Sequence, residues 1–175
     1  MDRLLEAAEQ IREFLERGGD VLTLILVLVF VLWLLIFERL IYYRTTHRRL
    51  EESMVQRWEA RPERMSRRAH DVRTAYIAEV KDALKRRLPM IRTLIAVAPL
   101  FGLLGTVTGM VGVFDVMASL GTGSARAMAS GISKATIPTM AGMVGALTGL
   151  LGISILERME RVRRARIEAR LTFDH

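Results

Sequence analysis

The 175-residue sequence contains no cysteine, which excludes disulfides and thiolate metal sites. Its three histidines, His47, His70 and His175, are scattered without a metal-ligand spacing, so no metal or other cofactor is expected. Glycine-rich stretches occur, but none continues into the Gly-Lys-Ser/Thr of a phosphate loop. No set of catalytic side chains emerges from the sequence. We therefore expect a protein that is not an enzyme.

Charged residues are nearly absent from three long segments, 21–37, 94–117 and 137–156, and the whole chain is 51% hydrophobic. About 20 apolar residues in a helix cross a bilayer core, and 17 are the lower limit. The first 20 residues are acidic and no small-residue cleavage site follows the first apolar segment, so no cleavable signal peptide is expected. The sequence predicts an all-α membrane protein with three transmembrane helices.

The remaining segments differ in charge. Residues 1–18 place Leu4, Ala8, Ile11 and Leu15 on one helical face, which predicts an amphipathic helix. Two interpretations of this helix stand: it lies in the membrane interface, or it packs on a partner protein. Gly18-Gly19-Asp20 is expected to end it.

Positive charge predicts the orientation in the membrane. Segment 38–93 contains 15 Lys or Arg against 8 acidic residues, and the 157–175 tail contains six Arg against four. The short 118–136 connection contains only two charged residues, Arg126 and Lys134. The positive-inside rule therefore predicts a cytoplasmic helical stalk (38–93), a cytoplasmic C-terminal helix and a periplasmic N-terminus and connection. The stalk is expected to break at Pro62, and either holds anionic lipid head groups or is a solvated hairpin without a ligand. This topology accounts for the net charge of +7, so no nucleic acid partner is expected.

Glycine recurs in the second and third segments at spacings of three, four and three. Such spacing puts the glycines on one face of a helix, where a neighbouring membrane helix can approach closely. We expect the two segments to pack against each other or against copies of each other through these residues: Gly102, Gly105, Gly109, Gly112, Gly142, Gly145, Gly149 and Gly152.

Hydroxyl groups are the polar groups that these segments offer, at Thr106, Thr108, Thr139, Thr148 and Ser154. For any single one, a hydrogen bond back to its own helix is the simpler expectation. Matched glycine faces with threonines at similar depths favour a polar-lined interior instead. Asp115 is expected at the outer rim, because mid-membrane placement of a carboxylate costs roughly 2.5–3.5 kcal/mol.

Two blocks of sequence resemble the MotA/TolQ/ExbB proton-channel family. One is Ala98 to Met110, APLFGLLGTVTGM, followed by Phe114, and the other is Gly131 to Met143, GISKATIPTMAGM. The resemblance extends over residues 20–160 and is greatest to a compact ExbB of a TonB system. It implies a pentameric ring whose second and third helices line a pore, and an ExbD-like single-span partner inside it with a proton-carrying aspartate. Thr106 and Thr139 match the pore threonines of the family and would face that aspartate.

By the same resemblance, the chain is expected in the bacterial inner membrane, where it couples the proton motive force to a TonB-like protein. One position departs from the family: Lys134 stands where ExbB and TolQ proteins commonly have glutamate, so no carboxylate relay is expected there. Lys134 would either reach the outer interface or pair with an acid of a partner. Two alternatives stay open, a TolQ-like role in envelope integrity and a structural membrane scaffold.

Overall fold

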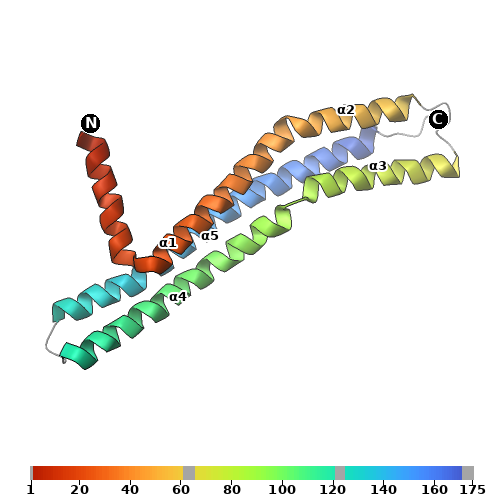
Figure 1. The fold of residues 1–175 in the computed structure, drawn as a ribbon. Coiled ribbons are helices and arrows are strands. Elements are labelled where there is room, and N and C mark those ends of the chain that lie inside the picture. The colour runs from red at the N-terminus through yellow and green to blue at the C-terminus, as the bar shows by residue number, and fades with distance from the viewer. Residues whose placement is uncertain (1, 61–65, 121–124, 171–175) are drawn as a thin grey trace. The chain divides into compact units, whose positions relative to one another are not determined.

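A computed structural model describes residues 2–60, 66–120 and 125–170 of the chain (Figure 1). These residues are nearly all α-helical. The helices of the described part are α1 (Asp2–Arg44), α2 (Thr46–Glu59), α3 (Arg67–Lys85), α4 (Leu88–Leu120) and α5 (Ala125–Arg170). The predicted all-α class is confirmed for these residues.

Three stretches of helix are long and apolar enough to cross a membrane, judged by length and composition. They lie within Gly18–Arg44, Arg67–Ser119 and Met128–Arg170. Each stretch contains one of the segments expected to span, 21–37, 94–117 and 137–156. The chain is thus a multi-pass helical membrane protein.

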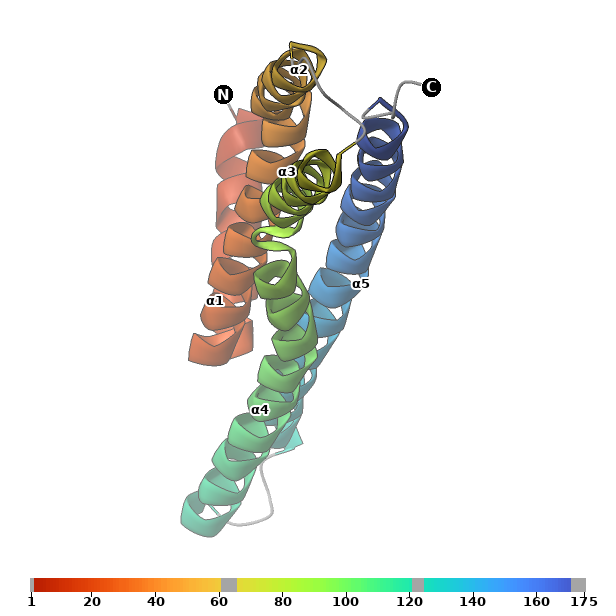
Figure 2. The same cartoon turned by 90° about the vertical axis from the view of Figure 1, so that its right-hand side faces the viewer.

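The chain forms two compact units, which are described separately. The first unit comprises Met1–Trp33 and Arg92–Leu150, and the second comprises Leu34–Ile91 and Leu151–His175. In the first unit, α4 and α5 lie side by side in both ribbon views (Figures 1 and 2). In the second unit, the buried core includes Tyr43, Trp58, Leu84, Leu156 and Ile167.

The N-terminal helix ends at Gly18-Gly19-Asp20, as expected, and a second helix of α1 follows after a kink. Gly19 has φ 67° and ψ −169°, outside the helical region, and helix continues on both sides of it within α1 (Figure 1). Side chains with a Cβ atom rarely adopt a positive φ, whereas glycine does so at little cost. Gly19 therefore lets the chain change direction between the amphipathic segment and the first apolar segment.

The connection expected at 118–136 is largely helical. Helix α4 continues to Leu120 and α5 begins at Ala125. The intervening residues 121–124, where the sequence places a Gly-Thr-Gly-Ser turn, lie outside the described residues, as does Pro62. Helix α3 begins after Ser66, whose hydroxyl accepts a hydrogen bond from the Ala69 amide at 3.2 Å. This side-chain cap satisfies one of the free amides of the first turn.

In the second unit, two side chains of α1 hold the C-terminal end of α3. The Tyr43 hydroxyl donates to the Leu84 carbonyl at 2.7 Å, and the Arg39 guanidinium donates to the Ala83 carbonyl at 3.4 Å. The last carbonyls of a helix have no partner within the helix, so they need such donors when buried. Arg39 is 2% exposed and its guanidinium also lies over the Tyr42 ring.

The turn from α3 to α4 is fixed to the same part of α1. Arg87 has φ 72°, an uncommon value for a residue other than glycine. Its guanidinium pairs with the Glu38 carboxylate at 2.7 Å. Consecutive turns of α1 thus hold both the end of α3 and the turn that leads into α4.

We expect Tyr43→Phe to lower stability measurably, because the substitution leaves the buried Leu84 carbonyl without its donor. The loss should be about 1–2 kcal/mol, or roughly 2–8 °C in melting temperature at this chain length. Tyr76→Phe removes the same atom from a half-buried tyrosine of α3 and serves as the control. Thermal melting of both purified variants in detergent tests the expectation, and equal shifts would contradict it.

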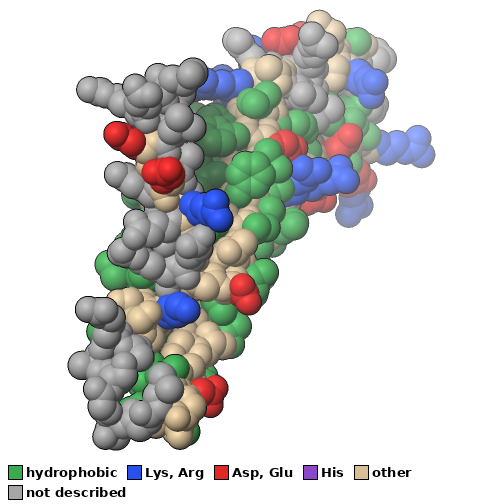
Figure 3. Space-filling view, turned by 60° about the vertical axis from the view of Figure 1, so that its left-hand side comes forward, with side chains coloured by type: hydrophobic (Ala, Val, Ile, Leu, Met, Phe, Trp, Pro, Cys, Tyr) green, Lys and Arg blue, Asp and Glu red, His purple; other side chains and the backbone are tan. Residues whose placement is uncertain are grey.

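The two units present different surfaces. In the space-filling view, blue and red side chains gather over the second unit, whereas the described surface of the first unit is mostly green and tan (Figure 3). The first unit exposes large apolar side chains such as Leu100, Val107, Phe114, Leu147 and Leu150. Exposed apolar area of this extent suits contact with lipid or with other apolar helices.

Candidate functional site

The interface of α4 and α5 in the first unit is built on close backbone contact. A Cβ atom placed on Gly102 would lie 2.9 Å from the Thr139 Cα atom, and one on Gly109 would lie 2.5 Å from the Ala135 Cα atom. A Cβ atom on Gly142 would lie 2.6 Å from the Ala98 carbonyl oxygen. No side chain fits at these three positions, so the two backbones approach as closely as glycine permits.

The other glycines of the predicted faces have different neighbours. A Cβ atom on Gly105 would contact the Pro138 ring, and one on Gly145 would contact Val29 of α1. One on Gly149 would contact both Leu32 of α1 and Ile95 of α4. In the second unit, Gly152 lies against Ile36 of α1, where an added Cβ would be 2.7 Å from the isoleucine Cδ1 atom. The glycine face of α5 therefore serves two partners, α4 and α1. Gly112 of α4 has no atom within 4 Å of an added Cβ.

The hydroxyl groups of α4 and α5 divide into two kinds. Thr106 donates to the Leu103 carbonyl at 2.6 Å, and Thr148 donates to the Gly145 carbonyl at 2.9 Å. Thr108 and Ser154 likewise bond within their own helices. Thr139 differs, because its hydroxyl donates across the interface to the Gly102 carbonyl at 2.8 Å. Of these five hydroxyls, Thr139 is thus the one that joins α4 and α5.

The bond of Thr139 determines what this hydroxyl offers to a ligand. A threonine hydroxyl has one proton to donate and two lone pairs to accept with. Since the proton is directed to Gly102, the lone pairs remain for a donor from outside. Thr139 is half-buried. The site can therefore accept a hydrogen bond from water or from a protonated acid without breaking the contact between the helices.

The two charged residues expected at the rim, Asp115 on α4 and Lys134 on α5, are both exposed. Among the described residues, no group of three or more His, Asp or Glu side chains is arranged to hold a metal ion. Apart from Asp115, the sequence from Leu94 to Met117 and from Ile137 to Leu156 contains no ionisable acid. The interface offers hydroxyls and backbone carbonyls and has no acid of its own at its centre.

Sequence reasoning missed a buried charge site in the second unit. Arg39 and Glu160 are 2% and 7% exposed, although the pattern of charge placed Arg39 at the end of the first span. A signal for Arg39 was present in the sequence. Leu32, Ile36, Arg39 and Tyr43 follow each other at spacings of four, three and four, and all four are buried.

Long apolar helices that pack through glycine and leave large apolar faces exposed define a helical membrane protein. Residues 41–169 match the model of the MotA/TolQ/ExbB proton channel family. The match extends over more than half of the chain. The protein therefore belongs to the MotA/TolQ/ExbB proton channel family, and the resemblance noted in its two sequence blocks is confirmed.

Part of the chain is also similar to a curated protein. The chain is 47% identical over 62 residues to a protein of Synechocystis sp. that is named an ExbB-like biopolymer transport protein. The aligned part is 34% of this chain and 24% of the relative. The chain thus matches about a quarter of the length of that relative.

Proposed function

We propose that this protein is an ExbB-type subunit of a proton channel in the bacterial inner membrane. In this proposal, several copies, by family resemblance five, form a ring around an ExbD-like single-span chain. Proton flow through the ring then energises a TonB-like protein and, through it, transport across the outer membrane. The N-terminus and the 118–136 connection are placed in the periplasm, and the stalk and C-terminal helix in the cytoplasm.

The observation that most supports this proposal is the α4–α5 interface. This interface places Thr139 next to Gly102 with two acceptor lone pairs remaining, in a region whose centre contains no carboxylate. A proton pathway here needs an acid from another chain. The family provides such an acid on its single-span partner.

The hydrogen bond of Thr139 suggests how the site distinguishes the two states of that acid. A protonated aspartate can donate to the Thr139 oxygen while the bond to Gly102 persists. A deprotonated aspartate can only accept, so Thr139 would have to turn its proton away from Gly102. The site thus holds the neutral acid without rearrangement. In this proposal, the deprotonated aspartate moves away from Thr139, and this movement turns the partner chain.

The exposed apolar faces support assembly into a ring. Large apolar side chains of α4 and α5 that remain exposed include Leu103, Leu104, Met110, Met140, Met143, Val144 and Leu151. Neighbouring copies, the partner helix and lipid would share these faces. A TolQ-like role is the alternative within the family, and the ExbB-like name of the Synechocystis relative favours the TonB type.

The proposal is tested by proton flux in vesicles. The full chain is expressed with an ExbD-like chain encoded beside it, purified, counted by native mass spectrometry and reconstituted with a pH-sensitive dye inside. We expect flux when both chains are present, and loss of flux when the partner aspartate is changed to asparagine. Equal flux without the partner, or no association between the two chains, would contradict the proposal. Loss of TonB-dependent uptake, rather than of envelope integrity, on deletion would separate the TonB type from the Tol type.

A further inference from the structure

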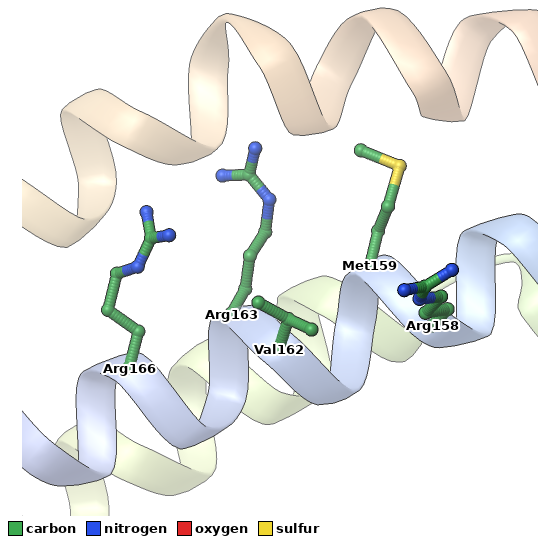
Figure 4. Close-up of a pocket in the computed structure, with 5 residues that line it drawn as sticks. All are labelled: Arg158, Met159, Val162, Arg163 and Arg166. Atoms are coloured by element: carbon green, nitrogen blue, oxygen red, sulfur yellow. The ribbon is translucent and has the colours of Figure 1, made fainter.

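A basic pocket lies on α5 in the second unit, immediately after the third apolar segment. Five side chains line it, namely Arg158, Met159, Val162, Arg163 and Arg166, and its volume is about 240 Å³. Figure 4 shows Met159, Arg163 and Arg166 projecting from α5 toward the neighbouring helix. Spacings of three and four residues bring these side chains to one side of the helix.

The lining combines two kinds of chemistry. Three guanidinium groups line the pocket and no acidic side chain does so. Guanidinium presents a planar set of N–H donors that matches the oxygens of a phosphate. Val162 and Met159 add an apolar wall, which a free inorganic anion does not need. A second hollow, at the α3–α4 turn, is lined by Asp82 as well as by basic residues, and its Arg87 already pairs with Glu38.

The position along α5 matches the depth of lipid head groups. Leu156 is the last residue of the apolar segment, and at 1.5 Å per residue Arg158 lies about 3 Å and Arg166 about 15 Å beyond it along the helix. The head-group region extends roughly 5–8 Å beyond each side of the hydrocarbon core. Arg158 therefore starts within the head-group region, whereas Arg166 starts beyond it and has a long side chain that can extend back toward the bilayer. The apolar residues Met159 and Val162 lie between the two arginines.

We propose that this pocket binds the phosphate of an anionic glycerophospholipid from the adjacent leaflet. The guanidinium groups of Arg158, Arg163 and Arg166 hold the phosphate, and Met159 and Val162 contact the glycerol. The lipid would tie the end of the third span to the bilayer surface. This assignment concerns the lipid alone and does not require proton conduction.

The test compares two double variants of the full chain that remove the same charge from the same helix. The pocket variant combines Arg158→Gln with Arg166→Gln. The control variant combines Arg161→Gln with Arg170→Gln, which are exposed arginines outside the pocket lining. Each protein is purified in detergent and titrated with phosphatidylglycerol or with phosphatidylcholine of the same acyl chains. Bound lipid is counted by native mass spectrometry, and circular dichroism verifies folding.

We expect the pocket variant to bind phosphatidylglycerol roughly 25-fold more weakly than the unaltered chain, since each basic group near an anionic lipid contributes about fivefold. The control variant should bind it within about threefold of the unaltered chain, and phosphatidylcholine should bind weakly to all three proteins. If both double variants bind phosphatidylglycerol equally weakly, the lipid is attracted by the overall charge of the helix. This result would contradict a specific site. Displacement of the lipid by millimolar inorganic phosphate would show a small-anion site and overturn the lipid assignment.

Discussion

The Gly109→Ala variant is expected to lose the packing of α4 against α5. A Cβ atom at this position would lie 2.5 Å from the Ala135 Cα atom and 2.7 Å from its backbone nitrogen. Neither atom can move without moving the whole of α5, so the two helices must separate. Overpacking of this kind costs about 3 kcal/mol, which corresponds to roughly 6–12 °C in melting temperature.

Gly112→Ala is the matched control for this prediction. It makes the same change one turn later in α4, where nothing lies within 4 Å of the added atom. Both substitutions favour the helix by about 0.5–1 kcal/mol, because alanine has less backbone freedom to lose than glycine. The difference between the two melting temperatures thus isolates the contact with Ala135. Similar melting temperatures for the two variants would show that α4 and α5 do not meet at Gly109.

The Thr139→Val variant is expected to fold and assemble but to conduct poorly. Valine keeps the shape of threonine and removes the hydroxyl, and with it the bond to Gly102 and the acceptor for an acid. A hydrogen bond to a charged or ionising group contributes about 1.5–3 kcal/mol, so proton flux should fall roughly ten- to hundredfold. The bond between the helices itself should contribute only about 0.6 kcal/mol in a membrane.

Two further variants define the cause of this loss. Thr139→Ser keeps the hydroxyl and should keep most of the flux. Thr148→Val removes a hydroxyl of the same helix that bonds to its own Gly145 carbonyl, and it should leave the flux unchanged. Flux is measured in the vesicle assay with the ExbD-like partner present. Full flux in an intact Thr139→Val assembly would remove Thr139 from the proton pathway.

Thr106 and Thr139 were paired by sequence as two equivalent pore threonines, and the structure separates them. Thr106 donates to its own helix at Leu103, whereas Thr139 donates to the facing helix. The two residues have the same side chain, so the difference depends on where the two helices meet.

The sequence by itself determined the class of this protein. Charge-free segments of about 20 residues must form helices in a bilayer, because every backbone polar group needs a partner within the segment. Glycine spacing indicated the surfaces suited to close packing, and the two motif blocks identified the family. These features are local in the chain, so they can be read without knowing which helix lies beside which.

The tertiary structure decided which partner each residue has. It placed Gly142 against α4, Gly145 against α1 and Gly149 against both, and among the described residues no atom lies within 4 Å of a Cβ added to Gly112. It buried Arg39, which the position of the charge had placed at the end of a span. The physical reason is that contact between helices depends on the angle and the position at which they cross. Both are set by residues far apart in the sequence. Periodicity within one helix specifies a face, but the neighbour of that face follows only from the packing of the whole chain.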